Sequence, residues 1–97
     1  MTRFSEAQRR LIASRAHALT DVTRIRILDV LSRAEQPVGR IATALMQEPS
    51  TVSKHLQVLF RAGFVERRRF ASTVIYSLVD DRVLEWCRYL SRRITKI

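Results

Sequence analysis

Apolar residues recur at steps of three and four along most of the chain, a spacing that predicts a mainly helical fold. From Ser5 to about Leu19 small and apolar residues share one face, and Ser5 can cap this first helix. Asp21 can cap a second helix that ends near Arg33. Its expected buried stripe consists of Val22, Ile25, Leu28 and Leu31, reinforced by Ile27 and Val30. Its expected outward-facing residues are Arg24, Arg26 and Asp29.

A third, short helix is predicted from Val38 to Leu45, and a fourth follows after a turn of three or four residues. Pro49 suits the first position of the fourth helix, because its missing N–H would have no partner there. Gly63 can close this helix in the left-handed conformation. The predicted buried face consists of Val52, Leu56, Leu59 and Gly63. The opposite face has hydrogen-bond donors and no acid, and consists of Ser50, Thr51, Ser53, Lys54, Gln57 and Arg61.

After Gly63 the apolar period changes from helical to alternating, which predicts a β-hairpin. Thr73 to Leu78 is rich in β-branched residues and forms one strand, with Val65 to Arg69 as its partner. Phe70-Ala71-Ser72 is the expected turn. From Asp80 the chain returns to a helical period in a last helix. Its stripe consists of Val83, Trp86 or Cys87, Leu90, Ile94 and Ile97.

These elements predict one domain over residues 1–97, mainly α with a small β-hairpin, because 97 residues have room for one modest hydrophobic core. The expected architecture is about five helices and a two-stranded wing. The helix-turn-helix covers about residues 38–62 and the wing about residues 64–78, between a first helix at about 5–19 and a last helix at about 80–97.

Charge narrows the classes of partner. The chain has 18 Lys and Arg residues against 9 Asp and Glu, a formal net charge of +9 on a small surface, which favours a polyanionic partner. Nucleic acid is the first candidate, while a membrane surface and a merely solvated basic surface stay open on charge alone. No apolar run approaches the roughly 20 residues of a membrane span, and Met1 to Arg15 does not resemble a secretory signal. We therefore expect a cytoplasmic protein without a membrane partner.

Two short helices joined by a tight turn and followed by an arginine-rich hairpin suit double-stranded DNA, because the second helix of such a pair fits the major groove. The candidates for base contact are Ser50, Thr51, Ser53, Lys54 and Gln57, with His55 next. The candidates for contact with phosphates or the minor groove are Arg40, Arg67, Arg68 and Arg69. A solvated edge strand would also explain the hairpin arginines, and a packed, hydrogen-bonded ring would also explain His55.

From Leu19 to Leu78 the chain resembles the ArsR/SmtB family of small dimeric winged-helix repressors. The resembling stretches are Leu19–Leu28, Val38–Leu45, Thr51–Leu59, Ala62–Val65 and Val74–Leu78. Three positions depart from the family pattern and concern local geometry. They are Met46 where Gly is common in the turn, Val22 in place of a common Pro, and Ala71 in place of a common Gly at the wing tip.

The resemblance implies a winged helix-turn-helix repressor of transcription that binds a palindromic operator as a homodimer. It implies that the first and last helices form the dimer and that each subunit places the helix from Ser50 to Gly63 in one half-site. The last helix independently supports a dimer, because it has more apolar side chains than so small a domain can cover, although packing within one chain is the alternative. These side chains are Trp86, Tyr89, Leu90, Ile94 and Ile97.

Metal-sensing members of the family use paired cysteines before the turn, or carboxylate and His ligands on the last helix. At the first of these places the present chain reads Pro37-Val38-Gly39-Arg40, and its last helix has no His. Transition metals prefer thiolate or imidazole ligands, so we expect neither a metal nor another cofactor. The inducer is unknown, and His17 is interpreted as structural.

Cys87 is the only cysteine, which excludes an intrachain disulfide, a cysteine-based zinc ribbon and a CxxC redox pair. On the stripe of the last helix it is expected to be a small core residue, and the alternative is a redox-active thiol that pairs with its symmetry mate. The sequence has no catalytic triad, Cys–His pair, paired carboxylates or phosphate loop, so we do not expect an enzyme. The rival function is a winged-helix module for protein assembly or structured RNA.

Overall fold

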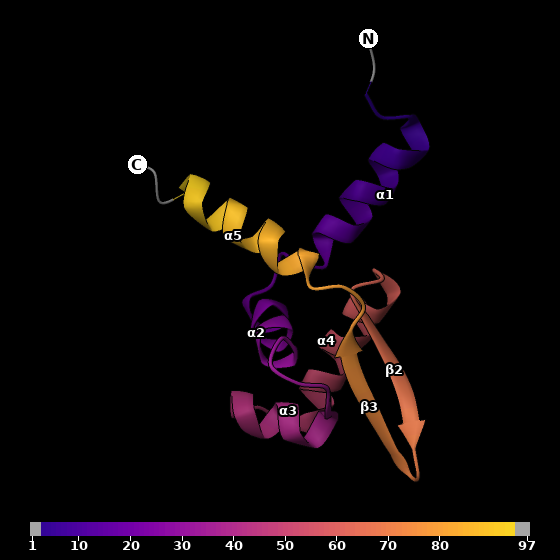
Figure 1. Ribbon diagram of the computed structural model, residues 1–97, viewed down its shortest axis with the longest axis vertical. Helices are drawn as coiled ribbons and strands as arrows, with labels where there is room; N and C mark the ends of the chain where they lie inside the picture. The colour runs from indigo at the N-terminus through magenta and orange to yellow at the C-terminus, as the bar shows by residue number, and fades with distance from the viewer. Residues whose placement is uncertain (1–2, 95–97) are drawn as a thin grey trace.

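The computed structural model describes residues 3–94 and has five helices and a three-stranded sheet in that range (Figure 1). The elements in chain order are α1 (Glu6–His17), α2 (Val22–Leu31), β1 (Gln36–Pro37), α3 (Val38–Leu45), α4 (Pro49–Arg61), β2 (Val65–Phe70), β3 (Thr73–Leu78) and α5 (Arg82–Ile94). The five helices predicted from the apolar period are therefore confirmed, and most of their ends lie within two residues of the predicted positions. Ile97, which belongs to the predicted stripe of the last helix, lies outside the described residues.

Local side-chain chemistry sets the helix ends. Ser5 caps α1 in a capping box, in which its hydroxyl accepts from the N–H of Gln8 and the Gln8 side chain accepts from the N–H of Ser5. Asp21 caps α2 by accepting from two backbone N–H groups. Gly63 follows α4 with φ +85°, the left-handed closing residue that the sequence predicts, although it is exposed rather than on the buried face.

The sheet is antiparallel in the order β1-β3-β2, so the hairpin has a third strand that the two-stranded prediction missed. β1 has only two residues, which are too few to show an alternating pattern, and Pro37 is a poor strand former. Phe70 pairs with Thr73 and belongs to β2, so its predicted place in the turn was wrong. The turn consists of two residues, of which Ala71 has φ +57°.

The core lies between the helix-turn-helix and the sheet, where α4 packs against α2, α3 and β2. Val52, Leu56 and Leu59 of α4 are fully buried, as predicted. The stripe of α2 is rotated from the predicted one, since Val22 is 67% exposed and Arg24 is buried with only 8% exposure. Positions of α2 three and four residues apart still face the core together, but one of them is an arginine that a purely apolar pattern excludes. The buried positions of α2 are Arg24, Ile27, Leu28 and Leu31.

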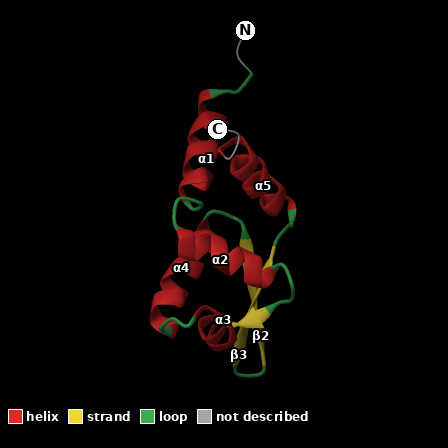
Figure 2. Ribbon diagram, turned by 90° about the vertical axis from the view of Figure 1, so that its left-hand side faces the viewer, coloured by secondary structure: helices red, strands yellow, loops and turns green. Residues whose placement is uncertain are grey.

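The two ends of the molecule have different surfaces. α1 and α5 diverge at one end, while α3 and the tip of the β2–β3 hairpin lie at the other (Figures 1 and 2). None of the described side chains of α1 is buried, so this helix has little contact with the rest of its own chain. Large apolar side chains about half exposed gather on α1, α5 and the segment before α1; they are Phe4, Leu11, Ile12, Trp86, Tyr89 and Leu90.

Met46 ends α3 in the left-handed conformation, with φ 54° and ψ 46°, at the position where the family pattern favours glycine. We expect Met46→Gly to raise the free energy of unfolding by about 0.5–1 kcal/mol, since the strain removed exceeds the added chain entropy of glycine. The side chain is 91% exposed, so its removal costs little packing. Urea unfolding measures the change. The matched control Ala44→Gly, within α3, should instead lower stability by about 0.5–1 kcal/mol. Equal destabilisation by both changes contradicts the prediction.

Candidate nucleic-acid interface

The polar face of α4 is presented by a helix-turn-helix whose turn has three residues, Met46 to Glu48, within the predicted three or four. Since the apolar face of α4 is fully buried, its polar face is directed outward. Of the predicted base-contact residues, Ser50, Thr51 and Lys54 are exposed, and Ser53 and Gln57 are half-buried. Two of these, Lys54 and Gln57, lie three residues apart and so are neighbours on one side of the helix. The structure therefore brings the donor set together on one surface.

The hairpin arginines point to alternate sides of β2, as the strand geometry requires. The Arg67 guanidinium lies 4.1 Å from the centroid of the Phe60 ring, in a cation–π contact that joins the hairpin to α4. Arg68 lies on the other side and forms a 2.6 Å ion pair with Glu35. Arg69 is exposed next to the tip. Arg40, on α3, is also exposed. The sequence did not single out Glu35 or Phe60, because both contacts join segments far apart in the chain.

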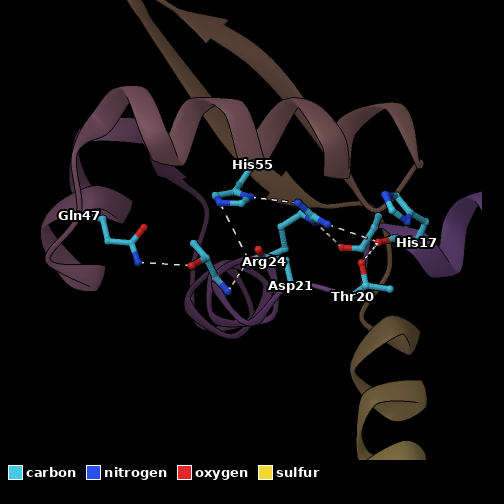
Figure 3. A network of polar contacts seen from close by, with 8 residues as sticks. His17, Thr20, Asp21, Arg24, Gln47 and His55 are labelled. Carbon is cyan, nitrogen blue, oxygen red and sulfur yellow. Dashed lines mark hydrogen bonds and ion pairs between the residues drawn. The ribbon is translucent and has the colours of Figure 1, made fainter.

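His55 belongs to α4, but its side chain is only 21% exposed and turns toward α2 (Figure 3). Its Nδ1 atom lies 3.1 Å from Nη1 of Arg24, and its Nε2 atom lies 4.0 Å from Oδ1 of Asp21. This placement matches the alternative of a packed, hydrogen-bonded ring that the sequence left open for this residue.

Arg24 was expected to face solvent, and that prediction was wrong. Its Nε donates to the carbonyl of Ala18 at 2.7 Å, and its Nη2 donates to the carbonyl of His17 at 3.4 Å. These carbonyls end α1, where the helix dipole favours a cation and the last carbonyl groups need donors. The guanidinium can therefore be buried between α1 and α2, because the carbonyl groups at the end of α1 accept its hydrogen bonds. His17 takes part through its backbone, in agreement with a structural role.

Asp21 holds the N-terminal end of α2 beside this cluster. Partial burial works to raise the pKa of its carboxyl, but the N–H groups of Arg24 and Thr23, with the nearby charges, outweigh it and leave the pKa below its usual value. The side chain of Thr23 accepts a 3.4 Å hydrogen bond from Nε2 of Gln47, in the turn between α3 and α4. The N-terminal end of α2 thus contacts both the turn and α4 (Figure 3).

A separate apolar groove of about 480 Å³ lies between α1 and α5. Leu11 and Ile12 of α1 face Trp86 and Leu90 of α5 across it, and Trp86 also packs edge-to-face on Phe64 at a centroid distance of 6.2 Å. Such a surface is unusual on a monomeric protein and typical of an interface.

Cys87 does not line that groove. It is half-buried and faces the opposite side of α5, beside Ile25 and Leu28 of α2. Burial raises the pKa of the Cys87 thiol, which the charge of Arg88 opposes only in part. A raised pKa lowers the fraction of reactive thiolate at neutral pH.

Within residues 3–94, no three His, Cys, Asp or Glu side chains are grouped so that they could hold a metal ion. Among the helices of the same range, none has the length and apolar character needed to cross a membrane.

Comparison with known proteins places this geometry in a family. Residues 21–67 match the family model described as bacterial regulatory protein, arsR family. The chain is 37% identical over 71 residues to the transcriptional repressor SmtB homolog of Synechocystis sp., an alignment that covers 73% of this chain and 54% of that protein. It is 36% identical over 74 residues to the HTH-type transcriptional regulator NmtR of Mycobacterium tuberculosis, which covers 76% of this chain and 62% of NmtR. The chain thus spans little more than half the length of these relatives.

The fold is similar to a solved structure over almost its whole length. The homodimeric winged helix-turn-helix DNA-binding domain Mb0332 of Mycobacterium bovis, a possible ArsR-family regulator, superposes with a TM-score of 0.84 at 28% identity and covers 99% of this chain and 94% of that one. The winged helix-turn-helix architecture predicted from the sequence is therefore confirmed. The named relatives are regulators of transcription and not enzymes, as expected. The sequence match and the fold together show that the chain belongs to the ArsR family of bacterial regulatory proteins.

Proposed function

We propose that this protein is a cytoplasmic transcriptional repressor that binds a palindromic double-stranded DNA operator as a homodimer. The observation that supports this most directly is the outward face of α4, which has hydroxyl, amide and ammonium groups and no acid, on a helix held from behind by three fully buried apolar side chains. Such a face can donate hydrogen bonds to base edges in the major groove, and it has no carboxylate that would repel the phosphates of DNA. The net charge of +9 supplies the general attraction to DNA.

The residues divide into two groups under this proposal. Ser50, Thr51, Ser53, Lys54 and Gln57 read bases. Arg40 and the hairpin arginines Arg67, Arg68 and Arg69 bind phosphates or the minor groove. His55 was a candidate for DNA contact, but the burial of its ring and its contact with Arg24 favour a role behind the DNA-binding surface.

The homodimer is supported by the apolar groove between α1 and α5, since a second copy would cover it with its own α1 and α5. A symmetric pair of α4 helices would then meet two symmetric half-sites. The M. bovis domain with the same fold is described as homodimeric. No metal is part of the proposal, and the inducing signal is unknown.

The test is selection of bound duplexes from a random DNA pool, followed by titration of the selected sequence against a random duplex at fixed salt. We expect an inverted repeat bound at least about 10³-fold more tightly than random DNA. Equal binding of selected and random duplexes contradicts the proposal. Enrichment of structured RNA in a parallel selection would favour an RNA-binding module instead.

The ion pair of Arg68 with Glu35 predicts unequal roles for the hairpin arginines. Arg69→Ala should weaken binding to every duplex alike and lower the salt slope of log K by about 1. Arg68→Ala should have a smaller effect, because Glu35 already neutralises part of its charge. Glu35→Gln should strengthen binding to all duplexes and raise the slope. Titrations from 50 to 200 mM salt, roughly the range over which such slopes are read, measure all three. Equal slopes for Arg68→Ala and Arg69→Ala contradict the prediction.

A further inference from the structure

Arg24 joins three segments with one buried side chain. Its guanidinium contacts the carbonyls of His17 and Ala18 at the end of α1 and the side chain of His55 on α4. Its backbone N–H donates to Asp21, the cap of its own helix. No carboxylate forms an ion pair with Arg24 among the described residues. A buried cation that is held by directional acceptors rather than by a salt bridge depends on the position of each acceptor.

The hydrogen bond between Arg24 and His55 determines which nitrogen of the His55 ring carries the proton. A guanidinium only donates hydrogen bonds, so Nδ1 of His55 must accept from Arg24. With Nδ1 as the acceptor, the N–H of the ring lies on Nε2, on the side of Asp21. Both nitrogen atoms of the ring are thus directed at α2 rather than at the outward face of α4 (Figure 3).

Along the chain, His55 lies between residues that the proposed function assigns to base contact, although it is not one of them. Lys54 precedes it, and Gln57 follows two residues later. The apolar contacts behind α4 are not directional, so they resist separation of the helices more than they resist a small rotation. The Arg24–His55 hydrogen bond is directional, and the contact of Gln47 with Thr23 adds a second link between α2 and the turn. Both contacts oppose a rotation of α4 about its axis, because such a rotation would lengthen or bend them.

We propose that Arg24 and His55 are positioning residues for sequence recognition, and this rests on the proposed function. The hydrogen bond between them holds α4 in the orientation that directs Lys54 and Gln57 at base edges. The same guanidinium holds the C-terminal end of α1, the helix that forms one wall of the apolar groove. The guanidinium thereby fixes the orientation of α4 relative to α1, the helix on which the proposed dimer is built. Loss of the Arg24–His55 hydrogen bond relaxes sequence preference without removing any side chain that contacts DNA.

The test compares three variants of this link for their affinity ratio between selected operator and random duplex. His55→Leu and Arg24→Met should lower the ratio about tenfold, through loss of operator affinity. His55→Asn puts an acceptor oxygen near the place of Nδ1 and should keep the ratio within about threefold of the wild type. Arg26→Met, the matched control, removes one exposed arginine from the same helix and should weaken both duplexes alike. If Arg24 and His55 act through one link, the double variant Arg24→Met/His55→Leu should lower the affinity ratio by no more than the more damaging single variant does.

The outcomes separate the two proposals. A wild-type protein without preference for any duplex overturns the proposed function and the positioning role with it. A normal wild-type preference that His55→Leu retains overturns the positioning role alone. Equal losses in His55→Asn and His55→Leu also overturn it, because they would mean that the ring itself touches DNA. If Arg24→Met does not fold by circular dichroism, the pair of His55 variants decides the question. In ¹⁵N NMR spectra of the free protein, His55 should show a proton on Nε2 and none on Nδ1, and a proton on Nδ1 excludes the link.

Discussion

Leu90→Glu is expected to convert the protein to a monomer and to weaken operator binding by about 10²- to 10⁴-fold. Leu90 is 52% exposed in one chain and lines the apolar groove between α1 and α5. In a homodimer that uses this groove, a carboxylate at this position would be desolvated against apolar side chains, at a cost of several kcal/mol. A monomer binds one half-site only, so it loses the gain in affinity that comes from joining two recognition helices.

Light scattering or sedimentation gives the oligomeric state, and titration with the selected duplex gives the affinity. Val79→Glu is the matched control. Val79 is also 52% exposed, and its substitution makes the same change in charge outside this groove. It should leave a dimer with operator affinity reduced by no more than about tenfold, through added negative charge. If Leu90→Glu still forms a dimer, the interface lies on another surface. If it is monomeric and binds the whole operator with wild-type affinity, the homodimeric mode of binding is wrong.

The helix-turn-helix and the hairpin could be predicted from the sequence because their apolar positions repeat with a clear period. Val52, Leu56 and Leu59 follow helical spacing and are fully buried, and the change to alternation after Gly63 falls where β2 begins. The helix ends were also predictable, since Ser5 and Asp21 are short polar residues at the start of each helix and cap it through local hydrogen bonds. Such features depend on neighbours in the chain, which a sequence displays directly.

The features that the sequence did not reveal depend on contacts between distant segments. Arg24 was assigned to solvent because charged residues are seldom buried without partners, and its partners lie in α1 and α4. β1 was missed because two residues have no period, and only pairing with β3 makes them a strand. The Arg68–Glu35 pair likewise joins β2 to the segment before β1. In the candidate site, the donor set of α4 could be predicted, whereas the contacts that orient it could not.

Two substitutions on the outward face of α4 should have the largest effect on sequence preference. Lys54→Ala and Gln57→Ala are each expected to reduce discrimination between operator and random duplex by about 1–3 kcal/mol, because ammonium and amide groups recognise guanine and adenine edges in the major groove. Both side chains lie on one side of α4, and neither forms a hydrogen bond or ion pair with another residue between positions 3 and 94, so unfolding free energies should stay within about 0.5 kcal/mol of the wild type.

Arg61→Ala is the control for these changes, because Arg61 is exposed in the last turn of α4, away from the N-terminal half that the proposed function places in the major groove of DNA. It should weaken operator and random duplexes alike, with a change in salt slope of about 1. Competition titrations against operators changed one base pair at a time would then assign each contact, since loss of Gln57 should abolish discrimination at one position and leave the others. If Lys54→Ala, Gln57→Ala and Arg61→Ala all weaken operator and random DNA equally, α4 contributes charge rather than base recognition, and the sequence-specific function is wrong.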